Sequence, residues 1–230
     1  MNMRKVPFEN EEFYHIYNRG VDKRDVFLDQ RDYERFLYLL YVCNDTAPLL
    51  NSQFYYRGFA SIEHYPRERK PTVSIACFCL MPNHLHLLVK QKENNGISLF
   101  MQKLGTAYTM YFNKKQNRSG VLFQGVFKSS HINREEYLIH LTRYIHLNPL
   151  ELCEPAWKEK EVAIKKSSYD FVNQYPWSSY QDYLGKKKFY KILWPEILSD
   201  LCSSPKQYEQ FVKEWAIKDL DQIEKFTLES

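Results

Sequence analysis

The amino-acid sequence predicts an α+β fold, namely a ferredoxin-like split βαβ sandwich with an antiparallel sheet, followed by a mainly helical C-terminal tail. The first observation is the order of the segments. Segments in which apolar and polar residues alternate predict strands, and segments whose apolar residues recur every three to four positions predict helices. Along the chain they follow the order β-α-β-β-α-β, with one further helix after them. The second observation is composition, because 44% hydrophobic and 16% aromatic residues in a chain of 230 are typical of a globular protein with a core.

The pattern starts with a strand and a helix. Residues 13–20 alternate, are rich in aromatic side chains and end at Gly20, which predicts a strand followed by a turn. Asp29 can cap a helix that runs to Val42, whose apolar positions follow helical spacing. Residues 45–72 contain three prolines and a charged run, so we interpret them as an insertion loop rather than core structure.

A hairpin, a helix, a strand and a last helix complete the pattern. The hairpin strands are apolar and are joined by a turn that contains a Pro-Asn pair. Both helices carry an apolar stripe; a Ser-Gly pair ends the first, and an Asn-Pro pair ends the second. The expected strands are residues 73–80, 84–90 and 121–128, and the expected helices are residues 97–115 and 133–147.

We divide the chain into two parts. Residues 1–150 hold the α+β pattern, including the 45–72 insertion, and form one domain. Residues 151–230 are aromatic and mixed in charge, and we expect them to form an extension that packs on the body. Its last amphipathic segment, from Pro205 to Glu224, is predicted to be helical.

Composition argues against several classes of protein. No run of about 18 apolar residues is present, so no membrane span is predicted. The N-terminus lacks the apolar segment of a signal peptide, so a cytoplasmic location is expected. The five cysteines are odd in number and scattered, which indicates free thiols rather than a disulfide framework.

One long segment lacks acidic side chains. The net charge of +4 is mild, but no Asp or Glu lies between Asn94 and Arg134. This distribution predicts a surface that faces a polyanion, with chance clustering on a solvated face as the alternative. The basic residues of the segment are Lys103, Lys114, Lys115, Arg118, Lys128 and Arg134.

Two histidines lie at the start of the second hairpin strand. His84 and His86 should point to one face of that strand, while Leu85 points to the other. Imidazole is a common metal ligand, so the pair is a candidate half-site for a divalent ion; the alternative is a surface strand with two polar side chains. Cys77 and Cys79 on the preceding strand offer a structural zinc site as a further alternative, against buried thiols.

A tyrosine and an asparagine lie one turn apart on the last helix of the body. Tyr144 and Asn148 therefore share a face, and Tyr144 could act as a nucleophile beside a carboxamide oxygen, although packing is the common role of such a tyrosine. We expect His140 to be a possible neighbour of this site and His146 to lie at the surface. The competing tyrosines are Tyr108, Tyr111 and Tyr137.

Several segments together resemble a known family. His84-Leu85-His86 follows Met81-Pro82-Asn83, residues 120–129 form the run GVLFQGVFKS, and residues 143–149 form the run RYIHLNP. These motifs resemble the single-tyrosine HUH transposases, and in particular the REP-associated tyrosine transposases. His15, Asn18 and Arg19 of the first strand and the segment 176–180 are also similar to that family, so the resemblance covers roughly residues 8 to 185.

The resemblance implies a transposase whose catalytic domain, residues 1–150, cleaves and rejoins single-stranded, hairpin-bearing DNA. By motif match, His84 and His86 would bind Mg²⁺ or Mn²⁺, with Asn148 as the third ligand. Tyr144 would be the nucleophile and would form a 5′-phosphotyrosine intermediate. The implied location is the bacterial cytoplasm, in association with the nucleoid, and the implied state is a monomer or a homodimer.

Candidate DNA-binding side chains are basic or polar and lie near these motifs. They are Arg19, Lys103, Lys114, Lys115, Arg118, Gln124 and Lys128. Two other functions stay open at this point. One is a domesticated protein that binds hairpin DNA without cleaving it, and the other is a metal-dependent hydrolase in which Tyr144 only packs.

Overall fold

The computed structural model describes residues 7–49, 56–155, 157, 165–194 and 204–215. Its centre is one antiparallel sheet of four strands in the order β2-β3-β1-β4. This order places the first strand between the third and the fourth, which is the arrangement of a ferredoxin-like sheet. The predicted fold class is confirmed. The strands are β1 (Phe13–Arg19), β2 (Val73–Met81), β3 (His84–Gln91) and β4 (Lys128–Ile132).

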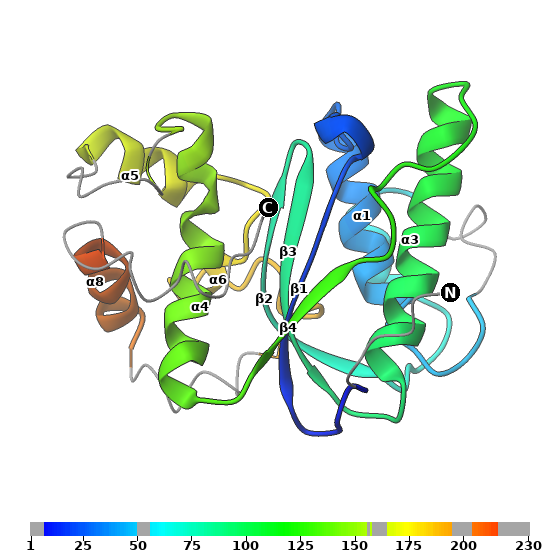
Figure 1. Ribbon diagram of the computed structural model, residues 1–230, viewed down its shortest axis with the longest axis horizontal. Coiled ribbons are helices and arrows are strands. Elements are labelled where there is room, and N and C mark those ends of the chain that lie inside the picture. Colours follow the sequence, from blue (N-terminus) through cyan, green and yellow to red (C-terminus); the bar gives the residue numbers. More distant parts are fainter. Residues whose placement is uncertain (1–6, 50–55, 156, 158–164, 195–203, 216–230) are drawn as a thin grey trace.

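Two helices cover one face of the sheet, on the right-hand side of Figure 1. They are α1 (Gln30–Val42) and α3 (Gly96–Lys115), and Asp29 caps α1 by accepting the backbone N–H of Asp32. Alternate side chains of β3 point toward these helices, because successive residues of a strand face opposite sides. Leu85, Leu87 and Val89 therefore enter the first core together with side chains of α1 and α3.

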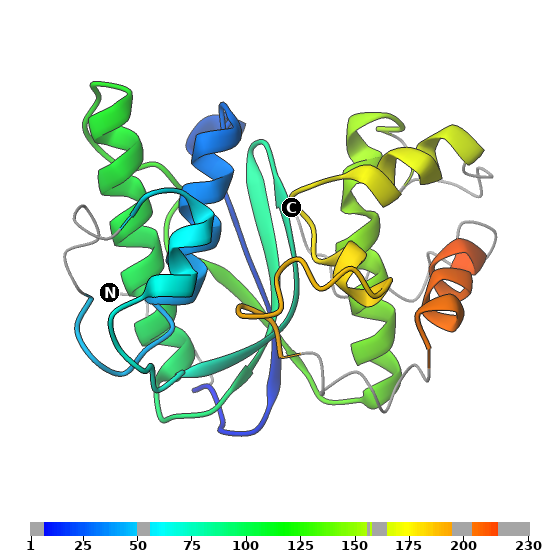
Figure 2. The same ribbon diagram turned by 180° about the vertical axis from the view of Figure 1, so that it is seen from behind.

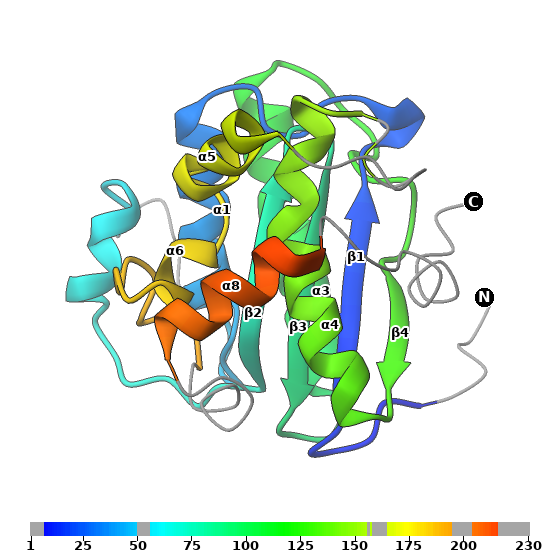
Figure 3. The ribbon, with the colours of Figure 1, turned by 90° about the vertical axis from the view of Figure 1, so that its left-hand side faces the viewer.

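The opposite face of the sheet is covered as well. The helix α4 (Glu135–Leu147) crosses this face, with helices of the extension outside it, as Figure 3 shows. Leu141 and Ile145 of α4 join Leu88 and Cys79 of the sheet in a second core. The short helix η3 (Asn148–Leu152) follows α4 across the boundary with the extension, which supplies α5 (Lys166–Gln174), α6 (Tyr180–Tyr183) and α8 (Pro205–Trp215).

Two pieces of the C-terminal extension run along the edge strand β2, as the view from behind in Figure 2 shows. The backbone N–H of Leu80 donates to the carbonyl of Trp177, and that of Ser179 donates to the carbonyl of Phe78. Farther along, the N–H of Trp194 donates to the carbonyl of Ile75 at 2.8 Å. These bonds occupy backbone groups that an open sheet edge would expose.

The expected strand at residues 121–128 is wrong in position. The strand starts at Lys128, and the residues before it form an irregular segment. This segment contacts β1 through isolated hydrogen bonds, such as Gln124 N–H to the Arg19 carbonyl and Asn18 Nδ2 to the Gly125 carbonyl. Gly120 and Gly125 both have positive φ, at 88° and 142°. Two such residues interrupt an extended backbone, which the apolar alternation of the sequence does not reveal.

The 45–72 insertion contains the short 3-10 helix η2 (Phe59–His64), which contacts α1. Ile62 of η2 is 4% exposed and joins the first core, so the expectation that this segment contributes no core residue is wrong at that position. The remaining 3-10 turn, η1 (Val21–Lys23), follows β1. The part of the expected last helix beyond residue 215 lies outside the described residues, and within the described ones no helix is long and apolar enough to span a membrane.

Candidate functional site

The two histidines of β3 point toward α4, as their alternation with Leu85 predicts. Their rings lie 5.1 Å apart, nearly perpendicular to each other. His84 is 3% exposed and His86 is 1% exposed, because α4 covers this face of the sheet. The pair is therefore a buried polar cluster inside the protein, and the surface-strand alternative is wrong.

The hydrogen bonds of His84 settle which ring nitrogen can bind a ligand. Nδ1 of His84 lies 2.6 Å from Oδ1 of Asn83. Nδ2 of Asn83 donates to the carbonyl of Lys23, which orients the amide so that its oxygen faces the imidazole. A carbonyl oxygen can only accept, so His84 donates from Nδ1 and keeps the lone pair on Nε2. This arrangement prepares Nε2 as a metal ligand.

His86 has a comparable partner on the neighbouring strand. Nδ1 of His86 lies 2.9 Å from Nε2 of His15 on β1, and the two rings are 5.1 Å apart and inclined by only 16°. His15 is 1% exposed. Both imidazoles are thus held between the sheet and α4, where neither ring can rotate without displacing packed neighbours.

Tyr144 faces the same cluster from α4. Its ring centroid is 5.7 Å from that of His86 and 6.3 Å from that of His15, edge to face in both cases. The ring of Trp157 packs beside it at 6.0 Å. Leu141 and Ile145, one turn and one residue away on α4, fix this orientation by entering the second core.

Asn148 follows Tyr144 by one helical turn, at the start of η3. Its Nδ2 donates to the Tyr144 carbonyl at 3.0 Å, which fixes the amide. The other amide atom, Oδ1, is buried and accepts no hydrogen bond from the part of the chain that the structure describes. A buried oxygen without a donor costs free energy unless an ion or a water satisfies it.

These atoms fit a divalent cation when an oxygen is included in the ligand set. Among the described residues, no three His, Cys, Asp or Glu side chains are arranged to hold a metal. Two imidazole nitrogens with the Asn148 oxygen leave positions for water and phosphate, which Mg²⁺ and Mn²⁺ favour. The zinc alternative finds no such support, since burial raises the pKa of the Cys77 thiol well above its ordinary value and disfavours the thiolate.

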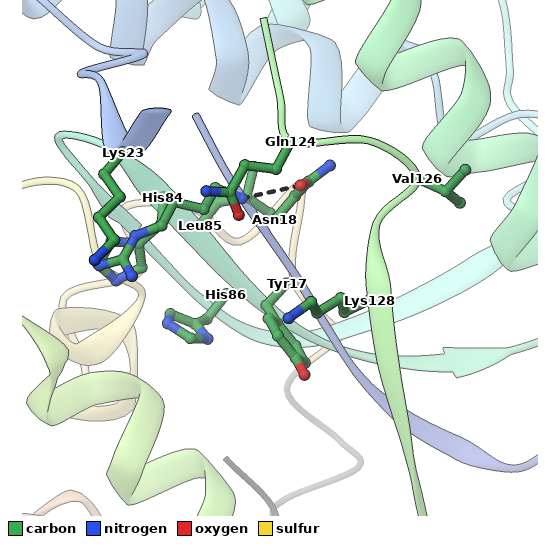
Figure 4. A pocket seen from close by; sticks show the side chains of 10 residues that line it. Tyr17, Asn18, Lys23, His84, Leu85, His86, Gln124, Val126 and Lys128 are labelled. Carbon is green, nitrogen blue, oxygen red and sulfur yellow. Dashed lines mark hydrogen bonds between the residues drawn. The ribbon is translucent and has the colours of Figure 1, made fainter. Parts of the chain in front are cut away.

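A pocket of about 400 Å³ opens beside the histidines. Figure 4 shows it from close by, with His84 and His86 on one wall and the residues of the irregular segment before β4 on another. Its basic lining makes it suitable for a phosphate group. The lining residues are Tyr17, Asn18, Arg19, Lys23, His84, Leu85, His86, Gln124, Val126 and Lys128.

Three of the seven predicted DNA-binding residues, Arg19, Gln124 and Lys128, line this pocket. The other four lie on or just after α3 and do not line it. Lys103 donates to two backbone carbonyls of residues 45–47, and Lys115 forms ion pairs with Asp29 and the buried Asp32. Arg118 is partly buried and donates to Asn113 and to the Val121 carbonyl. Lys114 is exposed.

The competing tyrosines are placed elsewhere. Tyr108 and Tyr111 belong to α3, across the sheet, where their hydroxyls donate to the Val26 carbonyl and to Asp32. Tyr137 lies at the first turn of α4 with Arg134 over its ring. Tyr144 alone among these four has a ring contact with His86 in the described structure.

Two histidines of α4 differ from expectation. His140 contacts Arg143 and the ring of Phe211, on the side of α4 that faces α8. His146 is fully buried, so its expected surface position is wrong. Its Nδ1 bonds the Tyr208 hydroxyl at 2.6 Å and its Nε2 bonds Ser179 Oγ at 2.8 Å.

The chain shows sequence similarity over its central part. Residues 39–148 match the family model described as "Transposase IS200 like". The match covers 110 of the 230 residues of the chain. The match starts within α1 and ends at Asn148, so it includes the histidines of β3 and Tyr144. The resemblance inferred from the motifs is confirmed at this level.

A solved structure supports the same assignment of fold. It is a REP-associated tyrosine transposase bound to a REP hairpin, and it matches with a TM-score of 0.50 and 13% sequence identity over 84% of this chain and 91% of that chain. No curated protein sequence matches the chain. At this identity, the similarity to the solved structure shows a shared fold only. The sequence match to the transposase family model is limited to residues 39–148.

Sequence reasoning missed three contributors to the site. Asn83 lies in a predicted turn, Trp157 lies outside every motif, and His15 is indicated only by the family resemblance. The sequence does contain a signal for His15, since it alternates with Ile16 and so faces the same side of β1 as Tyr17. Its contact with His86, 71 residues away, follows only from the pairing of β1 with β3.

Proposed function

We propose that the protein is a metal-dependent DNA strand transferase that cleaves and rejoins single-stranded, hairpin-bearing DNA through Tyr144. The observation that carries the proposal is the 5.7 Å ring contact between Tyr144 of α4 and His86 of β3. Both residues lie in the IS200-like segment. A tyrosine beside two imidazoles and an amide oxygen is a set of groups suited to phosphoryl transfer.

The proposed reaction is an exchange of phosphate esters. The Tyr144 hydroxyl gives up its proton as its oxygen attacks the phosphorus, and the bond between phosphorus and the 3′ oxygen breaks. The 3′ oxygen takes up one proton to become a 3′-hydroxyl, so the protons balance. The 5′ phosphate stays on Tyr144. Rejoining reverses these steps with the same atoms, so neither water nor ATP is consumed. A bound Mg²⁺ or Mn²⁺, held by His84, His86 and Asn148, would neutralise charge on the phosphate.

The pocket beside the histidines supports DNA as the partner. Arg19, Lys23 and Lys128 bring positive charge to it, and Tyr17 brings an aromatic ring on which a base can stack. The solved protein of similar fold is bound to a DNA hairpin. We propose a hairpin with unpaired flanking nucleotides as the substrate of this chain, because cleavage requires a flexible strand that can enter the pocket.

Burial of the nucleophile sets a condition on this reaction. The Tyr144 side chain is 2% exposed, with α4 pressed on the sheet and Trp157 beside the ring. A phosphate must come into contact with the tyrosine oxygen before attack. We therefore expect α4 or the Trp157 contact to shift when DNA binds.

A covalent-adduct assay tests the proposal. Wild-type protein is incubated with 5′- and 3′-labelled hairpin DNA and Mn²⁺, then separated on a denaturing gel. We expect the adduct to carry the 3′ label and not the 5′ label, because the fragment downstream of the cut stays attached to Tyr144 through its 5′ phosphate. Tyr144→Phe should abolish the adduct, because only the attacking oxygen is removed, whereas the matched variant Tyr137→Phe, also on α4, should retain it.

Each other outcome has a definite meaning. Binding of the hairpin by the wild type without any adduct would favour the domesticated DNA-binding protein. Cleavage that persists in Tyr144→Phe would favour a hydrolase in which Tyr144 only packs. An adduct that forms equally well in the presence of excess EDTA would contradict the role of the metal.

A further inference from the structure

We propose that His15 is the positioning residue of His86: it accepts the Nδ1 proton of His86 and thereby presents Nε2 of His86 to the metal. This inference rests on the proposed function, since it assigns a second contact to the same metal site. His15 would not touch the DNA or the metal. It acts through His86.

The geometry of the pair supports a fixed contact. Nε2 of His15 lies 2.9 Å from Nδ1 of His86, and the rings are nearly parallel, at 16°. Both side chains are 1% exposed, so water does not compete for this bond. His15 comes from β1 and His86 from β3, which pair directly, and contacts between sheet strands hold side chains more rigidly than loops do.

The proton between the two rings decides what His86 can do. Two nitrogens at 2.9 Å share one proton, since two N–H groups would collide and two lone pairs would repel. If His15 donates from Nε2, the neutral ring of His86 carries its proton on Nε2 and cannot bind a metal there. If His86 donates from Nδ1, its Nε2 lone pair is available. Only the second arrangement is compatible with ligation through Nε2.

The other proposed ligand shows the same arrangement independently. His84 donates from Nδ1 to the amide oxygen of Asn83, and this amide is oriented by the Lys23 carbonyl. Each histidine of the β3 pair thus has a side-chain partner on Nδ1. For His84 the acceptor is fixed by its chemistry, and for His86 we assign the acceptor role to His15.

His15 also lies next to the proposed nucleophile. Its ring centroid is 6.3 Å from that of Tyr144, edge to face, and 5.0 Å from that of Tyr17, which lines the pocket. A substitution that moves His15 therefore affects the ring on which the metal would sit and the ring that would attack. This position explains why a histidine, rather than an apolar residue, occupies a fully buried site on β1.

Metal affinity measured without DNA tests the inference. Binding of Mn²⁺ is followed by the loss of the free-ion EPR signal for the wild type, His15→Leu, His15→Gln and His131→Gln. We expect His15→Leu to weaken binding roughly 10- to 100-fold, the usual effect of removing such a partner. His15→Gln should recover most of the affinity, because its amide oxygen can accept the Nδ1 proton. The control variant is His131→Gln, because the His131 side chain is half-exposed on β4 and contacts Glu12 rather than the proposed metal site. This variant should bind Mn²⁺ as the wild type does.

The tautomer of His86 gives a readout that does not depend on metal or activity. Long-range ¹H–¹⁵N spectra of the metal-free wild type should show the proton of His86 on Nδ1. In His15→Leu the two tautomers should mix, while circular dichroism verifies that the variant is folded. A His86 proton on Nε2 in the wild type would overturn the inference, as would unchanged Mn²⁺ affinity in folded His15→Leu.

These readouts separate the two proposals. A wild type that holds the Nδ1 tautomer but binds no Mn²⁺ would contradict the metal dependence of the proposed function and leave the contact with His15 as described. Equal Mn²⁺ affinity of the wild type and the three variants would contradict only the role of His15.

Discussion

Lysines of this protein have different roles according to where each side chain ends. Lys128 lines the pocket beside the histidines, whereas Lys103 and Lys115 are held by backbone carbonyls and by carboxylates. The pairing of Lys115 with Asp29 lowers the pKa of that carboxyl, as expected for an ion pair between α3 and α1. Positive charge on a segment of sequence therefore does not by itself mark a DNA contact.

The role of Lys128 can be tested at this scale. Lys128→Ala should weaken binding to hairpin DNA and reduce the slope of log affinity against log salt by about 0.7 to 1, the effect of losing one phosphate contact. Fluorescence anisotropy at several salt concentrations measures both quantities. Lys213→Ala on α8, an exposed lysine away from the pocket, is the matched control. Equal slopes for the two variants would remove Lys128 from the interface.

The helix that carries Tyr144 is attached to the molecule on two sides. Its inner side packs on the sheet, and its outer side is bonded to the extension through His146 and Arg143. His146 joins α4 to Tyr208 of α8 and to Ser179 beside β2. The extension thereby fixes the position of the helix on which the proposed nucleophile lies.

The burial of His146 predicts a pH dependence of stability. Burial lowers its pKa from 6.5 to about 3, so the folded state keeps the ring neutral where the unfolded state binds a proton. As the pH falls from 6.5 toward 3, the unfolded state is favoured, by about 1.4 kcal/mol per pH unit at most. Between pH 7 and pH 5 the wild type should lose about 2 kcal/mol through this residue.

Urea unfolding at pH 7 and pH 5 measures this loss. His146→Gln should be less stable than the wild type at pH 7, because its side chain cannot reproduce both hydrogen bonds, but its stability should fall less between the two pH values. The difference between the two falls isolates His146 from the other titrating groups. Parallel falls would contradict the assignment.

The whole molecule has two cores, one on each face of the sheet. The first is formed by β-strand residues with α1, α3, Ile62 of the insertion, and Phe189, Ile192 and Leu193 of the extension. The second is formed by the opposite strand faces with α4 and other residues of the extension. Val172, Tyr175, Tyr180, Tyr208 and Val212 of the extension are all part of the second core. Residues 1–150 and the extension are thus joined by a shared hydrophobic core.

Removal of the extension after Leu152 should therefore disrupt the body. The truncated chain would expose the outer side of α4 and the edge of β2, both of which favour aggregation. We expect binding of ANS, a broad or aggregated profile in gel filtration and the loss of cooperative unfolding. A monomeric fragment that unfolds cooperatively would show that the body folds without the extension.

Local sequence patterns are sufficient to predict the order of the elements and to show which reactive side chains share one face of a strand or helix. His84 and His86 share a face, and Tyr144 and Asn148 share another, because strand and helix periodicity act over a few residues. The residues that match the IS200-like family were recognisable for the same reason, since they form contiguous motifs.

The neighbours of these residues depend on long-range packing. The contact between His15 and His86, the burial of His146 and the covering of the second face all join positions far apart in the chain. The start of β4 at Lys128 rather than residue 121 depends on glycines with positive φ, which apolar alternation does not register. Periodicity specifies which side of an element a residue occupies, but the partner on that side is set by long-range packing, which one strand or helix does not encode.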